Sequence, residues 1–361
     1  MDTSSYIVSF CIPCYNSADL VFRVVTQILK CKDERFQVVV SDSSSSDDTL
    51  KRLYSIKDTR LKICVTQPIP AEMNFLNALN CGDGEWLYLV MGRDLILADS
   101  IPKLIDLLNM ISSKKDIAFV KDQATTQKKY DKIQYYDSKA DALKRFIVDL
   151  SHPTGAIFRR DVFSKIPNKE IACKIFSVHA EVFWISKILE NWKSCELPAI
   201  VNKKLGWAWG ASIPRSTVST NPNSLYWFPA QKTLFSIKVM DMLSKHSLTP
   251  AEHDMLFIAQ WKGLMYSVST ELKDRFSGRK RRSTLLHYGL DPHMITNITK
   301  KEMCQNILQA YREVSHHYPH MSFRRKRKML TAMEDKMCEI SLNPYYNNFK
   351  IRLKSITKIR R

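Results

Sequence analysis

The sequence predicts an α/β protein with a mostly parallel sheet and flanking helices, and two stretches near its start carry this prediction. Each stretch is an apolar run of strand length, followed by a polar turn and then by apolar residues at helical spacing. The first runs from Val8 to Asn16, and the second begins at Val38 and reaches its polar turn at Asp42. This alternation implies right-handed crossovers and parallel strands. We therefore expect the two strands to end side by side, at the edge where such sheets bind ligands.

The rest of the first 120 residues continues the alternation of strands and helices. Asn16 or Ser17 is available to cap the first helix, and Asp47 is available to cap the second. The run Trp86–Met91 is continuously apolar, as expected for a central strand covered on both faces. The predicted segments, in order, are a strand at 8–12, a helix at 20–29, a strand at 38–42, a helix at 47–54, a strand at 61–65, a helix at 73–81, a strand at 86–91, a helix at 100–111 and a strand at 117–120.

Beyond residue 120 the sequence returns to the sheet and then becomes helical. A strand is expected at 154–159, a helix at 180–189 and a further strand at 197–201. From about residue 222 onward the pattern is helical and basic, without clear strands. With 361 residues, 45% of them hydrophobic, the chain can form one large α/β domain and a smaller helical one.

Four motifs, in order and at suitable spacing, resemble the nucleotide-binding half of a family 2 glycosyltransferase with the GT-A fold. They are VSFCIPCYN, VVVSDSSSSDDTL, DTRLKI and GEWLYLVMGRDLILADSI. The resemblance covers residues 6–120 closely and residues 150–210 loosely. It implies a GT-A domain over 1–215, with a nucleotide-binding half at 1–120 and an acceptor half at 121–215. A basic helical region at 216–361 would follow.

The resemblance implies inverting transfer of a sugar from a UDP-sugar to a hydroxyl of a glycan or lipid-linked glycan, in cell-surface polysaccharide assembly. Asp42 matches the residue that hydrogen-bonds the base, and a carboxylate suits the N3–H of uracil. Alternatively, Asp42 is an ordinary turn carboxylate, and Asn74 is an ordinary polar residue on a helix surface. The other residues expected at the nucleotide are Pro13, Tyr15 and Asn16 beside the base, Arg60 at base or phosphate, and Asn74 near the diphosphate.

The expected metal site is where the sequence departs from the family. The acidic triplet of the family aligns with Gly92, Arg93 and Asp94, so one carboxylate remains. Asp94 and two phosphate oxygens would suffice for Mg²⁺ or Mn²⁺, because these ions often use few carboxylates. Alternatively, Arg93 pairs with the diphosphate directly, which predicts weak or relaxed metal dependence, or it points to solvent.

The catalytic base is expected at the start of the helix at 180–189. Glu181 aligns with the family's aspartate, but Ala180 replaces the first acid of the family's pair. A carboxylate there would accept the proton of the attacking hydroxyl. His179 is an alternative base because imidazole titrates near neutral pH. Glu181 is also explained as a first-turn acid that the helix dipole favours.

Charge is unevenly distributed along the chain. The formal net charge is +19, yet residues 1–120 carry 13 Lys and Arg against 15 Asp and Glu, and residues 300–361 carry 15 against 5. The basic runs 279–282 and 324–328 attract polyanions. A nucleic-acid-binding protein is a remote alternative, since no recognition motif accompanies these runs. No specific nucleic-acid partner is therefore expected.

The C-terminal segment 347–361 predicts an amphipathic helix with apolar residues on one face and basic residues on the other. Such a helix suits an anionic membrane surface. Alternatively, it is a basic tail packed on its own domain. The apolar residues are Phe349, Leu353, Ile356 and Ile359, and the basic ones are Lys350, Lys354, Lys358 and Arg361.

Other sequence features restrict the compartment and the class of protein. No apolar run approaches the ~20 residues of a membrane span, and the start lacks a signal peptide pattern, so we expect a cytoplasmic protein, either free or peripheral on the inner face of the membrane. Nine irregularly spaced cysteines argue against a disulfide framework, although Cys11 and Cys14 form one CxxC that redox or zinc sites also use. The reduced acidic cluster leaves a catalytically impaired scaffold as an alternative. A homodimer is a further possibility.

Overall fold

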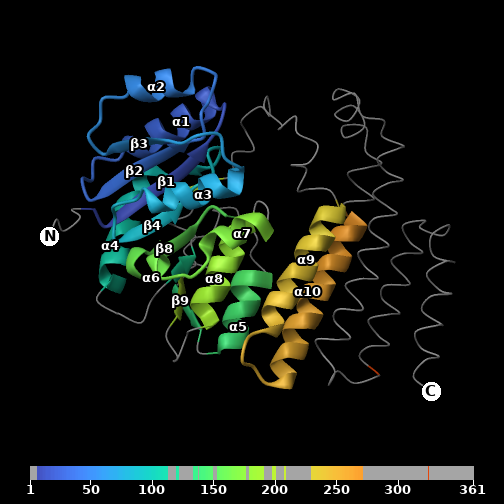
Figure 1. The fold of residues 1–361 in the computed structure, drawn as a ribbon. Helices are drawn as coiled ribbons and strands as arrows, with labels where there is room; N and C mark the ends of the chain where they lie inside the picture. The colour runs from blue at the N-terminus through green and yellow to red at the C-terminus, as the bar shows by residue number, and fades with distance from the viewer. Residues whose placement is uncertain are drawn as a thin grey trace, which may run out of the picture. The chain divides into compact units, whose positions relative to one another are not determined.

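The computed structural model describes residues 6–112, 119–121, 133–136, 138–148, 153–175, 179–190, 197–200, 207–208, 229–270 and 324. The chain divides into two compact units, residues 1–218 and residues 219–361 (Figure 1). In the second unit, α9 (Pro229–Ser244) packs against α10 (Pro250–Thr270).

Within the described residues, no helix is both long enough and apolar enough to span a bilayer. The run 279–282 and the segment 347–361 lie outside the described residues, as does the run 324–328 apart from the exposed helical Arg324.

The first unit is built on a six-stranded sheet in the order β3-β2-β1-β4-β8-β6. The first four strands are mutually parallel, and β8 lies antiparallel between β4 and β6. This confirms the predicted α/β class with a mostly parallel sheet. The strands are β1 (Val8–Cys14), β2 (Phe36–Asp42), β3 (Leu61–Val65), β4 (Trp86–Leu89), β6 (Phe119–Lys121) and β8 (Ala156–Arg159).

Right-handed crossovers decide which face each helix covers. The chain moves outward from β1 to β3 and then crosses back to β4, so the third crossover must lie on the face opposite the first two. Figure 1 shows α1 and α2 on one side of these strands and α3 on the other. The helices are α1 (Ala18–Leu29), α2 (Thr49–Ser55), α3 (Ala71–Asn80) and α4 (Ile101–Ser112).

The rest of the first unit adds short elements around β8. Two small antiparallel pairs join distant segments, β5 with β10 and β7 with β9. The strands are β5 (Leu95–Ile96), β7 (Ile133–Tyr136), β9 (Leu197–Ile200) and β10 (Trp207–Ala208). The helices are η1 (Ala98–Ser100), α5 (Lys139–Leu143), the π-helical turn η2 (Lys144–Val148), α6 (Arg160–Ser164), α7 (Lys169–Ile175) and α8 (Ala180–Glu190).

An aromatic cluster fills the main core of the sheet. Phe10 of β1 meets Phe36 edge to face at 5.7 Å between ring centroids and Tyr88 of β4 at 5.3 Å. All three rings are fully buried. They bring large apolar areas and favourable ring geometry to the contact between neighbouring strands. The side chains of α1 that complete this core are Val21, Val24, Val25, Ile28 and Leu29.

The first helix is capped from another loop, so the prediction of a local cap by Asn16 or Ser17 is wrong. Ser17 makes no side-chain cap bond. Instead, the amide of Ser17 donates to the Thr49 hydroxyl at 3.0 Å, and the amide of Ala18 donates to the Asp47 carboxylate at 3.3 Å. Asp47 also accepts from the amide of Thr49 at the start of α2. One carboxylate therefore ties together the loops that follow β1 and β2.

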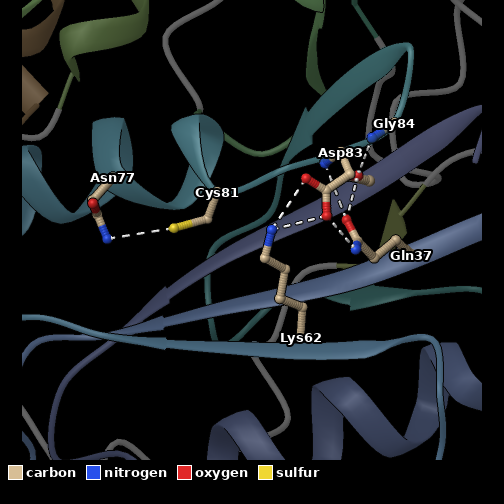
Figure 2. Close-up of polar contacts among 7 residues, drawn as sticks. Gln37, Lys62, Asn77, Cys81, Asp83 and Gly84 are labelled. Atoms are coloured by element: carbon tan, nitrogen blue, oxygen red, sulfur yellow. Dashed lines mark hydrogen bonds and ion pairs between the residues drawn. The ribbon is translucent and has the colours of Figure 1, made fainter. Parts of the chain in front are cut away.

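A polar network aligns β4 with the rest of the sheet. Asp83, in the turn before β4, accepts from Lys62 and from Gln37, each at 2.8 Å (Figure 2). The Gly84 amide donates to the Ser9 hydroxyl at 2.8 Å. A Cβ on Gly84 would lie 2.6 Å from the backbone nitrogen of Ser9, so only glycine fits this turn. The network fixes the starting point of β4, and through it the loop at the other end of β4.

The CxxC pair does not form a common site. Cys11 and Cys14 are three residues apart on one strand, so their side chains point to opposite faces. The Cys11 thiol donates to the Ser9 carbonyl, and the Cys14 thiol donates to Asp42. Burial raises the pKa of both thiols well above the ordinary cysteine value, and for Cys14 the neighbouring Asp42 adds to the effect.

The raised thiol pKa values predict that Cys11 and Cys14 resist alkylation, because the thiolate is the reactive form. After iodoacetamide treatment of the native protein at pH 8, peptide mass spectrometry is expected to find both unmodified. The partly exposed Cys64 serves as the internal control for labelling. Unfolding in urea should make Cys11 and Cys14 reactive. Rapid labelling of either in the native state, or a disulfide between them, would contradict this placement.

Candidate functional site

The carboxyl ends of β1, β2 and β3 meet at one edge of the sheet. Cys14 pairs with Asp42, and Asp42 pairs with Val65 in the parallel register. The Ser43 amide donates to the Cys14 carbonyl at 3.1 Å, so the pairing continues one residue into the loop. The two polar turns therefore lie side by side, which confirms the arrangement predicted from the two motifs.

Asp42 is completely buried and holds its own loop. Its Oδ1 accepts from the Ser45 amide at 2.8 Å, and its Oδ2 accepts from the Ser45 hydroxyl at 2.5 Å and from the Cys14 thiol at 3.4 Å. These bonds match the alternative of a turn carboxylate. A base can reach Asp42 only if the Ser45 hydroxyl moves aside, since that hydroxyl donates where a base N–H would donate. Contact between Asp42 and a base stays a prediction.

Tyr15 and Asn16 take different parts at this edge. The Tyr15 side chain is 60% exposed, and Val65 at the end of β3 is also exposed, so apolar surface is available beside the strand ends. Asn16 has a left-handed backbone, with φ of 43°, and its Oδ1 accepts from the Ser46 amide at 2.8 Å. Pro13 is a buried residue of β1. Of the three residues predicted beside the base, Tyr15 is therefore the one whose side chain is open to a ligand.

Asn74 joins α3 to the ends of two strands. Its amide nitrogen donates to the carbonyls of Cys14 and Ser41, each at 3.0 Å, and its Oδ1 accepts from the Ser41 hydroxyl at 2.5 Å. It is buried, so the alternative of a helix-surface residue is wrong. Its polar atoms are all engaged by the protein, and Asn74 thus positions the edge rather than presenting a group to a ligand.

Arg60 does not belong to this edge, and its prediction as a nucleotide-binding residue is corrected. It precedes β3, so it lies at the amino ends of the parallel strands, opposite Asp42. Its guanidinium is bonded to Asp58 and is centred 4.7 Å from the Phe36 ring. The same group also donates to three backbone carbonyls near the end of α1, those of Leu29, Cys31 and Asp33. Arg60 is therefore a structural residue.

Asp94 is a poor fit to the predicted divalent ion. Its side chain is fully buried, and Oδ2 accepts from the Thr154 hydroxyl at 2.6 Å. The same hydroxyl accepts from the Met91 amide at 2.9 Å, and the buried Lys121 ammonium donates to the Thr154 carbonyl at 2.9 Å. Across the part of the chain that the structure describes, no three His, Cys, Asp or Glu side chains gather in a geometry for a metal. One of the two Asp94 oxygens is thus held by Thr154, and Asp94 as a metal ligand stays a prediction.

Arg93 occupies the same loop but faces outward. Its side chain is exposed, and within the described residues it forms no ion pair with an acid. The preceding Gly92 lies close to β1, because a Cβ there would be 3.3 Å from the Pro13 carbonyl. The loop after β4 therefore brings Arg93 to the end of β1, next to the edge that carries Tyr15.

Glu181 lies in the first turn of α8 and is only 2% exposed. His179 Nδ1 is 3.1 Å from Glu181 Oε1, while no group in the described ranges donates to Oε2. A buried carboxylate oxygen without a donor is costly and marks a candidate functional group. The structure thus brings together both candidate bases, Glu181 and His179, with one carboxylate oxygen held and no donor to the other among the described residues.

Contacts between helices connect α8 to the strand ends. The Trp184 indole of α8 donates to the Lys169 carbonyl of α7 at 3.2 Å. The Cys173 thiol of α7 donates to the Glu72 carbonyl of α3, also at 3.2 Å. Because α3 is bonded to β1 and β2 through Asn74, the candidate base is fixed to the sheet by packed helices rather than by a free loop.

Sequence reasoning placed Thr154 only at the start of a strand, and it did not single out Lys121 or Ser45 as residues of this edge. None of them stands out by type or spacing, and only the strand order brings the first two to Asp94. A cavity of about 420 Å³ lies elsewhere, between the last turn of α1 and Pro102, and includes none of these residues.

Comparisons with known proteins agree with this architecture. Residues 9–167 match the model named Glycosyl transferase family 2. The structure of Staphylococcus aureus TarS 1–349 in complex with UDP-GlcNAc is 14% identical with a TM-score of 0.58, and the match covers 94% of this chain and 91% of the TarS 1–349 chain. The structure of TarS 1–349 without a ligand is 13% identical with a TM-score of 0.54, and the match covers 91% of each chain.

A mannosyltransferase from Pyrobaculum calidifontis, in complex with GDP-Man and Mn²⁺, is 14% identical with a TM-score of 0.47 over 91% of this chain and 86% of its own. No curated protein matches the sequence. At these identities the TarS structures establish the fold, which is GT-A.

Proposed function

We propose that this protein, which belongs to glycosyl transferase family 2 through residues 9–167, moves a sugar from a UDP-sugar to a glycan hydroxyl with inversion at the anomeric carbon. Family membership supports a nucleotide-sugar glycosyltransferase, and the UDP-GlcNAc named for TarS supports the choice of UDP. The single observation that carries the catalytic part is Glu181, buried with one oxygen held by His179 and the other without a donor among the described residues.

In the proposed reaction Glu181 is the general base. Its Oε2 takes the proton of the acceptor hydroxyl, while the hydroxyl oxygen forms a bond to the anomeric carbon. The bond from that carbon to the diphosphate oxygen breaks, and its electron pair leaves with UDP. His179 holds the other carboxylate oxygen, which keeps the base in one orientation. Attack from the side opposite the leaving group accounts for inversion.

The nucleoside is proposed to bind at the shared edge of β1 and β2. Tyr15 offers an exposed aromatic face there, and Asp42 would accept from uracil N3–H once the Ser45 hydroxyl has turned away. Asn16 and Asn74 hold the two loops and strand ends that frame this position.

The acceptor is proposed to be a glycan or lipid-linked glycan of cell-surface polysaccharide assembly. Association with an anionic membrane through residues 347–361, and dimerisation, remain predictions because the C-terminal residues that bear on them lie outside the described part of the chain. Peripheral association with the inner face of the membrane is proposed on the same basis.

The donor class is tested by thermal unfolding with UDP, TDP, CDP and GDP, each with Mn²⁺ present. UDP at 100 times its Kd is expected to stabilise the protein by about 2.7 kcal/mol. CDP should stabilise it less, because cytosine lacks the N3–H that Asp42 would accept. Asp42→Asn is expected to reduce this preference for UDP over CDP. Stabilisation by none of the nucleotides would refute the proposed function and favour a scaffold role.

A further inference from the structure

We propose that Arg93 neutralises the donor diphosphate directly, so that donor binding and sugar transfer require no divalent ion. The inference rests on the proposed function, because it concerns the leaving group of that reaction. Three features of the loop after β4 lead to it: the engagement of Asp94, the buried cation beside Asp94, and the outward position of Arg93.

The first feature is that Asp94 is already used by the protein. A metal ligand of this kind must offer an oxygen to an ion that keeps several waters. Asp94 is fully buried, and one of its oxygens accepts a short hydrogen bond from Thr154. Thr154 in turn accepts from the Met91 amide, so the Thr154 hydroxyl links Asp94 to Met91 in the loop after β4. An ion that drew Asp94 away from Thr154 would break these hydrogen bonds.

The second feature is the buried Lys121, whose ammonium already brings positive charge to Thr154, the residue that holds Asp94. Lys121 at the end of β6 and Leu89 at the end of β4 both pair with Ala156, so they lie at the same edge on either side of β8. The buried Lys121 ammonium donates to the carbonyl of Thr154, whose hydroxyl donates to Asp94. A buried ammonium is costly without a nearby opposite charge. Thr154 thus links Lys121 to Asp94, and a divalent cation here would add positive charge where a buried ammonium already lies.

The third feature is the exposed guanidinium of Arg93. Gly92 allows the loop to approach the Pro13 carbonyl closely, which places Arg93 beside the end of β1. Within the described residues no acid pairs with Arg93, so its charge is not used in the protein. A guanidinium fork can donate to two phosphate oxygens at once. It can therefore stabilise the negative charge that develops on UDP as the bond to the sugar breaks.

The proposal is tested by calorimetric titration of the full-length protein with UDP, in EDTA and in Mn²⁺. Wild type is expected to bind UDP with the same affinity in both. Arg93→Ala is expected to weaken UDP binding by about 10- to 100-fold, the value of hydrogen bonds to a charged group. Uridine, which lacks the diphosphate, should bind Arg93→Ala as tightly as wild type, which shows that the nucleoside site is intact.

Arg160→Ala is the matched control for this experiment. Arg160 is also exposed, but its amide donates to Glu85 before β4, so it lies at the opposite edge of the sheet. Its removal is expected to leave UDP affinity unchanged. Arg93→Lys should retain part of the affinity, because it keeps the charge and loses the fork.

Each other outcome overturns the inference in a different way. A loss of UDP affinity of about tenfold or more in EDTA, restored by Mn²⁺, would show that a metal holds the diphosphate, while the proposed function would stand. Equal weakening of UDP and uridine by Arg93→Ala would show that Arg93 supports the fold of the site and not the phosphate. Absence of UDP binding in both buffers would refute the inference together with the proposed function.

Discussion

Replacing Glu181 with glutamine is expected to lower kcat by about 10²- to 10⁴-fold, the usual contribution of a general base. Glutamine keeps the size of the side chain and an oxygen that can face His179, but it cannot accept the acceptor's proton. KM for the donor and binding of UDP should change little, because Glu181 is proposed to act on the acceptor. The measurement is UDP release from a panel of UDP-hexoses and UDP-N-acetylhexosamines, with thermal unfolding as a check of the fold.

His179 provides the matched variant for this experiment. If Glu181 is the base, His179→Gln should reduce kcat less than Glu181→Gln, because the new side chain can still donate to Oε1 and hold the carboxylate. If His179 is the base, the order of the two variants is reversed. Full activity of Glu181→Gln would rule out the assigned role and leave its buried oxygen unexplained.

Replacing Arg60 with methionine is expected to destabilise the first unit by roughly 3–5 kcal/mol, because several buried acceptors lose their donor at about 1–3 kcal/mol each. The carbonyls of Leu29, Cys31 and Asp33 lose their donor, and Asp58 loses its counter-charge. Urea unfolding measures the change. Calorimetry should find unchanged UDP affinity in the folded variant, since Arg60 lies at the edge opposite the site. A selective loss of UDP binding with normal stability would contradict this placement.

Arg35 is an internal control with the same local geometry. In both Asp-x-Arg segments the arginine Nε is 3.1 Å from aspartate Oδ1, and Nη2 bonds Oδ2 at 2.7 Å for Arg35 and 2.8 Å for Arg60. The side chains differ in exposure, 43% for Arg35 and 6% for Arg60. Arg35→Met is therefore expected to cost less than Arg60→Met, because the Arg35 guanidinium is half-exposed and water can replace part of its bonding. Equal costs at the two positions would show that burial is not what makes Arg60 important.

The effect of Arg60 should also depend on pH. The Arg60 hydrogen bond lowers the pKa of Asp58 below its ordinary value. Stability from this pair is therefore fully present above the unfolded pKa of about 3.9, and it is lost as the pH falls through the lower folded value. The difference in unfolding free energy between wild type and Arg60→Met should accordingly shrink in acid. A difference that stays constant below pH 4 would mean that the carbonyl bonds, and not Asp58, dominate.

Much of the site could be predicted because it depends on local patterns. The β-branched run before Asp42 and the apolar run before Asn16 specify strands, and their following helices specify parallel pairing. With those strands assigned, the sequence also sufficed to predict that Arg60 lies at the amino ends of the strands, away from the ligand edge. Arg60 precedes a strand, whereas ligands in such sheets bind after strands. The motif resemblance pointed to the opposite conclusion, and strand direction was the better guide.

Local patterns in the sequence specify the α/β class, the order of strands and helices in the first 120 residues, and the edge where Asp42 and Tyr15 meet. These depend on hydrophobic periodicity, which acts over a few residues. Long-range packing accounts for the bond from Thr154 to Asp94, the bond from Lys121 to Thr154, and the capping of α1 by Asp47, 29 residues further along the chain. Those contacts depend on strand order and on which loops meet in space. The antiparallel insertion of β8 between β4 and β6 brings its first residues to the ligand edge, and no local pattern specifies that insertion.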